Sequence, residues 1–415
     1  MIRNISKLGK PVNASIIAQP SKAHTLRAII VASLAGGKSV IEKPLLADDQ
    51  LAAIKAMRRL GAKIIIQEKE LVIIGIPKFK KIALNAGSSG FLARALLAIA
   101  TASGEGITVD ASPQMRKRPI SELCLALSQL GAKIIFLRKP NHFPAAIKGP
   151  LKGGKIVLDA GKSSQFLSAI LLAAPLASAS IEITAKNLVS GPYVNITLEI
   201  MEKFGVKVQK RGNEFKIAPQ KYMPTNMSIE GDYSSAAFFM ELAAITGGKV
   251  KIAGLSRETK QGDKAILPIL EKMGCNIHRS RNTVEVTGPK ILKPVIFNMK
   301  NFPDLAVPIA VTAAFANGTS ILQNIGQLKF KESDRLEAIK INLGKMGVKV
   351  EERNGNLAIH GNSNAHGATI NPFNDHRIAM AFAIAGLRTG NMKIRNAECV
   401  RKSFPTFWKE IEKLF

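Results

Sequence analysis

A polar-headed, alanine-rich apolar helix recurs six times along this chain, at intervals of roughly seventy residues. The copy at 162–179 reads KSSQFLSAILLAAPLASA, in which Ser163 or Ser164 is a good N-cap and the apolar run suits a fully buried helix. The other five copies begin at Ser21, Gly87, Asp232, Asn301 and Asn371. The repeat predicts one supersecondary unit used six times, because each copy can bury its apolar face only against others.

A second repeat separates these helices. Five amphipathic helices are each predicted to end at a glycine that is followed by a strand pattern. Glycine at that position favours the left-handed conformation that closes a helix. These glycines are Gly61, Gly131, Gly205, Gly274 and Gly347. The stretches after them are typical of hairpins, and Asn354-Gly355 supplies a two-residue turn.

Together the repeats predict an α/β fold of βαβαββ-type units, with sheets outside and the alanine-rich helices packed inside. The sixth copy has helices at 375–387 and 405–415 but lacks strands after them, and residues 2–18 can supply those strands. The chain is therefore expected to close on itself as two domains of three units each. One domain comprises 1–18 with 231–415, the other is the inserted 19–230, and the crossings lie near 19–21 and 229–233.

The composition limits the classes of function. A chain of 415 residues with 46% apolar content can bury a large core. We expect a cytoplasmic protein, because the start is polar and basic, no apolar run can span a bilayer, and three scattered cysteines form no disulfide or zinc motif. The net charge of +29 fits either a nucleic-acid partner or a site for small anions. Scattered lysines and 5% aromatic residues favour small anions.

The helix starts and the loops between strand and amphipathic helix carry many cations and few acids. Helix starts and arginine side chains both bind carboxylate and phosphate, so this pattern favours electrostatic catalysis on polyanionic substrates. Taken singly, 331–335 also fits an ordinary helix start and 375–377 a cap with a surface pair. The residues concerned are Lys22, Arg27, Arg118, Ser163, Ser164, Gln165, Ser190, Tyr193, Asp304, Lys331, Glu332, Asp334, Arg335, Asp375, Arg377 and Lys402.

Several short motifs occur in the order and spacing of one enzyme family. They are Ser21-Lys22 with Arg27, Arg118-Pro119, Ser163-Ser164-Gln165-Phe166, Val189-Ser190 with Pro192-Tyr193, Glu230-Gly231-Asp232, Gln261-Gly262-Asp263, Pro303-Asp304, Lys331-Glu332-Ser333-Asp334-Arg335-Leu336, Asp375-His376-Arg377 and Lys402-Ser403-Phe404-Pro405. Over nearly its full length the chain resembles 5-enolpyruvylshikimate-3-phosphate (EPSP) synthase, or 3-phosphoshikimate 1-carboxyvinyltransferase, the family that glyphosate targets. The resemblance implies a two-domain inside-out α/β barrel with the active-site cleft between the domains.

The resemblance also implies the reaction. The enolpyruvyl group of phosphoenolpyruvate (PEP) would pass to the 5-hydroxyl of shikimate 3-phosphate, releasing phosphate, without metal or organic cofactor, in the shikimate pathway to chorismate and aromatic amino acids. Asp304 would take the hydroxyl proton, and Glu332, assisted by Lys22, would serve the methylene carbon. Shikimate 3-phosphate would be held by Lys22, Arg27, Ser163, Ser164, Gln165, Ser190, Tyr193, Asp304, Gln327 and Lys331. PEP would be held by Lys22, Gly90, Arg118, Gln165, Arg335, Asp375, His376, Arg377 and Lys402. We expect a monomer without nucleic-acid or membrane partners.

Four positions depart from the family pattern, one of them Asn298, where an acid is common. Ala23 replaces a serine whose hydroxyl would reach the shikimate carboxylate, a loss of about 1–2 kcal/mol if nothing replaces it. Phe91 stands where threonine is expected and should narrow the PEP side of the cleft. Gln327 replaces the usual asparagine or histidine.

Two alternatives stay open. The sister enzyme that transfers enolpyruvyl to UDP-N-acetylglucosamine normally has cysteine or aspartate five residues before the arginine of Arg118-Pro119, where this chain has Pro113. The other alternative is a catalytically weakened homologue that acts as a basic binding protein.

Overall fold

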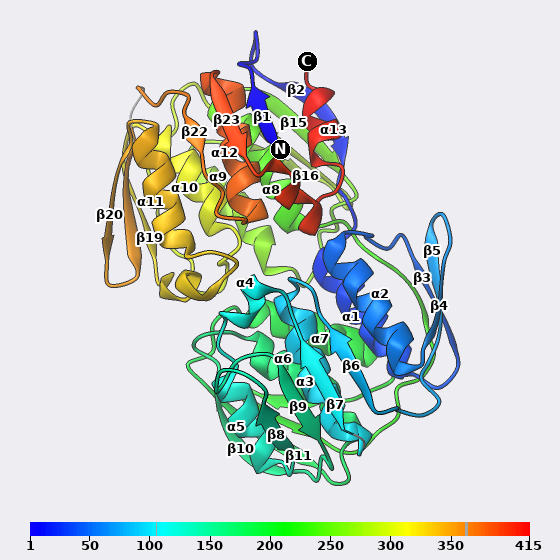
Figure 1. The fold of residues 1–415 in the computed structure, drawn as a ribbon. Helices are drawn as coiled ribbons and strands as arrows, with labels where there is room; N and C mark the ends of the chain where they lie inside the picture. The colour runs from blue at the N-terminus through cyan, green and yellow to red at the C-terminus, as the bar shows by residue number, and fades with distance from the viewer. Residues whose placement is uncertain (105, 362–363) are drawn as a thin grey trace. The chain divides into compact units, whose positions relative to one another are not determined.

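The computed structural model describes residues 1–104, 106–361 and 364–415, and the chain divides into two compact units (Figure 1). Unit 1 comprises Met1–Gln19 and Glu230–Phe415, and unit 2 comprises Pro20–Ile229. Each unit has its own hydrophobic core, to which the alanine-rich helices contribute many of the residues. The sheets lie around these helices, which confirms the predicted placement of sheets outside and helices inside.

The six apolar helices form where the repeat predicts them, and their sides are almost wholly buried. Polar side chains cap several of them: Ser21, Ser89 and Asp375, for example, accept hydrogen bonds from main-chain N–H groups of the first turn. The helices are α1 (Lys22–Leu34), α3 (Gly90–Ala100), α6 (Gln165–Ala173), α8 (Tyr233–Thr246), α10 (Ala306–Ala314) and α12 (His376–Thr389). Within the cores α3 packs against α6, and α8 packs against α10 and α12.

The amphipathic helices alternate with the apolar ones. They are α2 (Asp48–Leu60), α5 (Ser121–Gln129), α7 (Gly191–Lys203), α9 (Ile266–Lys272), α11 (Arg335–Lys345) and α13 (Phe407–Glu412). The five glycines predicted to close them all have φ between +80° and +117°, the left-handed region. A short helix, α4 (Pro113–Arg116), precedes α5 in unit 2.

In the described part of the chain, five sheets have four strands and one has three. The strands of unit 2 are β3 (Lys38–Glu42), β4 (Lys63–Ile66), β5 (Glu70–Ile74), β6 (Ile82–Asn85), β7 (Ile107–Asp110), β8 (Lys133–Phe136), β9 (Ala145–Lys148), β10 (Gly154–Asp159), β11 (Ile181–Lys186), β12 (Gln209–Arg211), β13 (Glu214–Ile217) and β14 (Asn226–Ser228). Those of unit 1 are β1 (Ile2–Ile5), β2 (Asn13–Ile17), β15 (Lys249–Ala253), β16 (Asn276–Arg279), β17 (Thr283–Thr287), β18 (Ile296–Asn298), β19 (Gly318–Gln323), β20 (Lys349–Arg353), β21 (Asn356–Gly361), β22 (Thr369–Ile370) and β23 (Met392–Arg395).

The βαβαββ order is clearest in the sheet β10-β11-β13-β12. β10 pairs in parallel with β11 across α6, and the hairpin of β12 and β13 follows α7 and adds antiparallel strands. A parallel pair needs a crossover connection, which the apolar helix provides, so that helix is held against the inner face of its sheet.

The N-terminal strands serve two different sheets, and here the sequence prediction is wrong in part. β1 pairs antiparallel with β23 and completes the sheet of the sixth repeat, as predicted. The sequence also predicts β2 in that sheet, but β2 pairs in parallel with β15, at the edge of the sheet β16-β17-β15-β2. A reciprocal exchange occurs at β14, which precedes α8 yet pairs in parallel with β3. At each crossing the chain thus leaves an edge strand in the unit that it departs from, and edge-strand pairing has little signature in the sequence.

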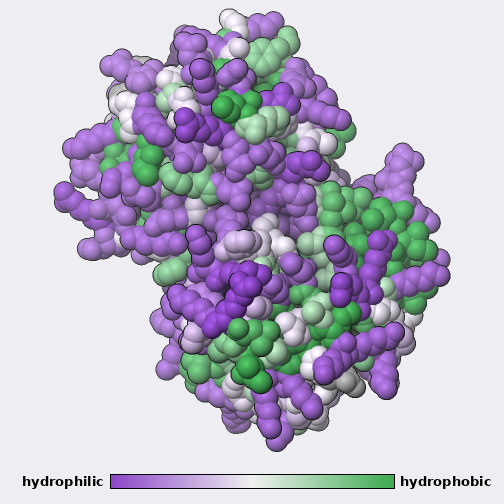
Figure 2. Space-filling model, in the orientation of Figure 1, coloured by the Kyte–Doolittle hydropathy of each residue, from purple (hydrophilic) through white to green (hydrophobic). Residues whose placement is uncertain are grey.

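Hydrophilic residues cover most of the face seen in Figure 2, in keeping with the net charge of +29. Hydrophobic residues gather over α2 and the sheet of β3, β4 and β5, where Leu51, Ile65 and Ile74 are exposed. Across the described residues, no helix combines the length and the apolar character needed to cross a membrane.

Glu241 of α8 is a carboxyl group buried in the core of unit 1. Its side chain is fully buried, and among the described residues neither carboxylate oxygen has a hydrogen-bond partner. Burial raises the pKa of Glu241 well above its ordinary value. The folded protein therefore keeps a proton that the unfolded chain releases, and the free energy of unfolding should fall by up to about 1.4 kcal/mol per pH unit above the ordinary carboxyl pKa.

We expect Glu241→Gln to remove this pH dependence. Thermal melts should show the variant more stable than the unmodified protein at pH 8, with a smaller difference at pH 5. The matched control is Glu337→Gln on the exposed face of α11, which should change the melting temperature little at either pH. An unmodified protein as stable as the Glu241→Gln variant at pH 8 would contradict the prediction.

Candidate functional site

In unit 2 the predicted site residues gather near the starts of four helices. Arg27 Nε of α1 donates to Thr197 Oγ1 of α7 at 2.8 Å, and the Thr197 hydroxyl donates to Ser168 Oγ of α6 at 2.9 Å. Arg94 of α3 donates to Gln165 Oε1, the first residue of α6. These contacts bring the positive ends of α1, α3, α6 and α7 to one region, which is a general arrangement for binding anions.

Serine hydroxyls line the same region. Ser163 Oγ accepts from the main-chain N–H of Gln165 at 3.3 Å, and Ser163, Ser164 and Ser190 are all buried. Ser190 has a left-handed conformation with φ +55°, and among the described residues its hydroxyl has no hydrogen-bond partner. Since Arg94 donates to the side-chain oxygen of Gln165, the N–H₂ group at the other end of this amide does not contact the guanidinium.

Lys22 begins α1 and is held by α2. Its Nζ lies 2.8 Å from Asp49 Oδ2, and its main-chain carbonyl accepts from Gln50 Nε2 at 3.0 Å. The Asp49 side chain is only 5% exposed, whereas that of Lys22 is 20% exposed. The ammonium group is therefore fixed on one side by a buried carboxylate and remains accessible on another.

Arg118 lies against Gly90 at the start of α3. A Cβ atom built on Gly90 would lie 2.6 Å from Arg118 Nη1, so any side chain at this position would displace this buried guanidinium. The loop that carries Arg118 is fastened at its base by Arg116, which makes two bonds to the carboxylate of Asp110 at 2.9 and 2.5 Å. This bidentate pair joins the end of β7 to α4.

In unit 1 one arginine holds three carboxylates. Arg335 is fully buried, and its guanidinium lies 2.8 Å from each of Asp304 Oδ1, Glu332 Oε2 and Asp375 Oδ2. Burial alone would lower the pKa of Arg335, but the charges of Asp375, Glu332 and Asp304 raise it well above its ordinary value. The residue stays cationic and fixes the three acids relative to one another.

Asp304 is shared between two arginines. Its second oxygen lies 2.9 Å from Arg377 Nη2. Burial opposes ionisation of Asp304, yet Arg377 and Arg335 outweigh it and hold the pKa far below its ordinary value. Nearby, burial and the charge of Asp304 raise the pKa of Asp263 to about 6, although Arg377 opposes this shift. The two carboxyl groups therefore differ in proton affinity, as acid and base groups at enzyme sites often do.

The remaining predicted residues of unit 1 lie on neighbouring segments. Lys331 contributes to the electrostatic field at Asp304, and His376 lies buried with Nδ1 3.7 Å from Asp375 Oδ1. Lys402 is 5% exposed, and Gln327 donates from Nε2 to the carbonyl of Lys300 at 3.3 Å. The predicted residues thus form two groups, one in each unit, with Lys22 in unit 2 and Asp304 and Glu332 in unit 1.

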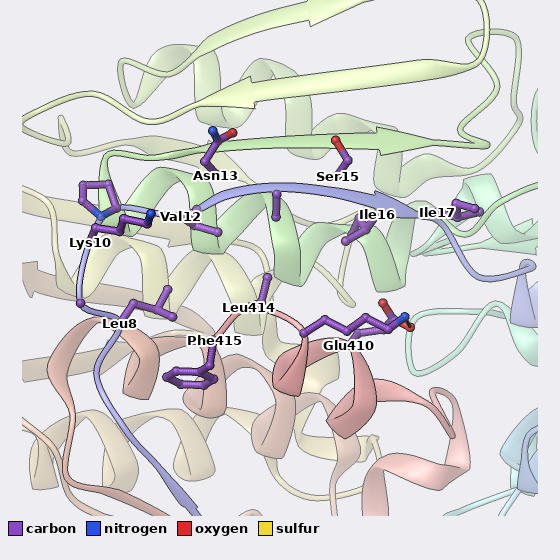
Figure 3. Close-up of a pocket in the computed structure, with 14 residues that line it drawn as sticks. Leu8, Lys10, Val12, Asn13, Ser15, Ile16, Ile17, Glu410, Leu414 and Phe415 are labelled. Carbon is purple, nitrogen blue, oxygen red and sulfur yellow. Dashed lines mark hydrogen bonds and ion pairs between the residues drawn. The ribbon is translucent and has the colours of Figure 1, made fainter.

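Two further features of the described residues bear on the site. Unit 1 contains a cavity of about 850 Å³ between β2 and the end of α13, lined by residues such as Asn13, Ser15 and Leu414 (Figure 3). None of the predicted site residues lines it. Among the described residues, no group of three or more His, Cys, Asp or Glu side chains could hold a metal ion.

Several contacts of the site were not predicted. Asp49, Thr197 and the Asp110–Arg116 pair act on predicted residues or on their loops. Asp263 belongs to the motif Gln261-Gly262-Asp263, but the sequence predicts no role for it. Asp49 lies at 47–49, one of the loops expected between a strand and an amphipathic helix, and this position was the available signal. Thr197 lies inside an amphipathic helix, where nothing in the sequence distinguishes it.

Comparison with known proteins identifies the family. The family model described as EPSP synthase (3-phosphoshikimate 1-carboxyvinyltransferase) matches residues 6–411. The chain is 38% identical over 409 residues to the 3-phosphoshikimate 1-carboxyvinyltransferase of Methanosphaerula palustris, covering 97% of this chain and 96% of that one. It is 40% identical over 408 residues to the protein of the same name from Thermococcus kodakarensis, covering 97% and 98%. The solved EPSP synthase of Acinetobacter baumannii superposes with a TM-score of 0.83 at 27% identity, covering 100% and 98%. The chain therefore belongs to the EPSP synthase family.

Proposed function

We propose that this protein transfers the enolpyruvyl group of PEP to the 5-hydroxyl of shikimate 3-phosphate and releases phosphate. The observation that carries the proposal is the family match over residues 6–411, together with the gathering of the predicted cations and acids into two groups. Dense positive charge suits two substrates that carry phosphate and carboxylate groups, and the paired acids suit proton transfer. The support for the individual roles comes from geometry and from the family motifs.

The proposed reaction is an addition followed by an elimination. Asp304 accepts the proton of the 5-hydroxyl while the hydroxyl oxygen bonds to the central carbon of PEP, and the methylene carbon receives a proton from Glu332, assisted by Lys22. The tetrahedral intermediate then loses phosphate as its methyl group returns a proton to Glu332. Buried arginine and lysine side chains stabilise the anionic groups throughout.

The two groups of residues lie in separate units, so the proposal requires both units to act on one pair of substrates. We propose a cleft between the units, with hinges near residues 19–21 and 229–233, that closes on the first substrate and excludes water. Action as a monomer in the cytoplasm is part of the same proposal. Small-angle scattering with and without shikimate 3-phosphate tests the closure, and light scattering tests the monomer.

The deciding experiment measures phosphate release with PEP and shikimate 3-phosphate, and in a second arm with PEP and UDP-N-acetylglucosamine. Turnover with PEP and shikimate 3-phosphate, but not with PEP and the nucleotide sugar, supports the proposal. Turnover with the nucleotide sugar alone would favour the sister enzyme, despite Pro113 at the position of its cysteine or aspartate. Binding of shikimate 3-phosphate without turnover would favour the weakened homologue.

Gly90→Ala is expected to weaken the binding of PEP but not that of shikimate 3-phosphate. The added methyl group would lie 2.6 Å from Arg118 Nη1, so the guanidinium must move from its position. We expect the KM for PEP to rise roughly 10- to 100-fold, because a charge-assisted contact is misplaced, while the Kd for shikimate 3-phosphate changes less than about threefold. Gly36→Ala, where a Cβ would meet nothing within 4 Å, is the matched control. An unchanged KM for PEP would contradict the assignment of Arg118 to that substrate.

A further inference from the structure

Arg27 is a buried cation with neutral partners. The residue is 3% exposed, and its guanidinium donates to the Thr197 hydroxyl at 2.8 Å and to the main-chain carbonyls of Ala23 and Tyr193 at 3.0 and 3.1 Å. Within the described residues it forms no ion pair with a carboxylate. Burial lowers its pKa to about 9, so it remains charged at neutral pH. A desolvated cation without a counter-charge has a strong tendency to bind an anion.

Phe91 covers one face of this guanidinium. The Cζ atom of Arg27 lies 4.1 Å from the centre of the Phe91 ring, and Phe91 itself is 7% exposed. An aromatic face stabilises a desolvated cation, and here the Phe91 ring also limits the orientation of the planar Arg27 guanidinium. The ring comes from α3 and the arginine from α1, so the contact also joins two helix starts of the site.

We propose that Phe91 is a positioning residue for shikimate 3-phosphate, holding the Arg27 guanidinium in the orientation that binds the shikimate carboxylate. The inference rests on the proposed function. It moves Phe91 from the PEP side, where the sequence alone would put it, to the side of the other substrate. Arg27 also donates to the carbonyl of Ala23, the residue that lacks the family's serine hydroxyl. In this chain the fixed arginine plane would thus strengthen the carboxylate contact that remains after the serine hydroxyl is lost.

Calorimetric titration with shikimate 3-phosphate tests the proposal directly. Phe91→Leu, which keeps bulk but removes the aromatic face, should weaken binding roughly tenfold, and Phe91→Tyr should retain binding within about twofold. The KM for PEP, measured at saturating shikimate 3-phosphate, should change less than threefold in both variants. Because shikimate has the carboxylate without the phosphate, its binding should weaken by the same factor in Phe91→Leu.

Controls separate positioning from folding. Phe215→Leu removes another buried ring of unit 2, on β13, and should lower the melting temperature without changing the Kd. If Phe91→Leu does not fold, Phe91→Met provides the same comparison. Equal affinity of Phe91→Leu and the unmodified protein would overturn this inference alone, and so would a loss confined to shikimate 3-phosphate with none for shikimate. Failure of the unmodified protein to bind shikimate 3-phosphate would instead overturn the proposed function.

Discussion

Glu332→Gln is expected to lower kcat at least about a hundredfold while leaving both KM values within a few-fold. The Glu332 carboxylate accepts from Arg335 Nη2 at 2.8 Å, and a glutamine carbonyl can accept the same hydrogen bond. The arginine keeps Asp304 and Asp375 as partners, so the arrangement around it should persist. The amide cannot exchange a proton with the methylene carbon of PEP, and the loss therefore falls on the chemical step.

Steady-state phosphate release and single-turnover measurements check this prediction. The control is Glu337→Gln, which makes the same change on the exposed surface of α11 a few residues away. Its kcat should be unchanged. A Glu332→Gln variant that retains a third or more of the normal kcat would exclude Glu332 from proton transfer, and a large rise in both KM values would indicate a structural role instead.

The repeat made most of the fold predictable. Six apolar helices and five closing glycines fix the order of elements. Each closing glycine, such as Gly61 or Gly347, adopts the left-handed conformation that ends a helix and leads into a strand. The placement of β2 was not predictable from the same pattern. Its five residues alternate in burial as those of any edge strand do, and their partner is chosen by the three-dimensional position of β15.

The site was predictable to the extent that its residues lie in dense motifs. Arg335 and Asp375 lie 40 positions apart in the chain, and two motifs of one family assign both to the PEP site, although their contact itself was not predicted. Contacts made by single residues inside ordinary helices, such as Thr197 with Arg27, leave no local mark. Phe91 shows a further limit: a substitution is visible in the sequence, but the contact of its ring with Arg27 of α1 is visible only in the structure.

Lys22→Ala is expected to lower kcat/KM for PEP at least about a hundredfold, through two separable effects. The first is the loss of an ammonium group that binds substrate and assists proton transfer. The second concerns Asp49, whose Oδ2 lies 2.8 Å from Lys22 Nζ and whose side chain is 5% exposed. Without the lysine, a buried carboxylate would lose this ion pair close to the proposed position of an anionic substrate. Lys55→Ala on the exposed face of α2 should be neutral.

The double variant Lys22→Ala/Asp49→Asn separates these two effects. Removing the carboxylate's charge should recover at least about threefold in the KM for PEP relative to Lys22→Ala, because a repulsive buried charge is gone. It should recover nothing in kcat, since the proton-transfer group is still missing. A double variant indistinguishable from Lys22→Ala in both parameters would mean that Asp49 only anchors α1 to α2. Recovery of kcat would show that Lys22 acts mainly by neutralising Asp49, and would remove Lys22 from the chemistry.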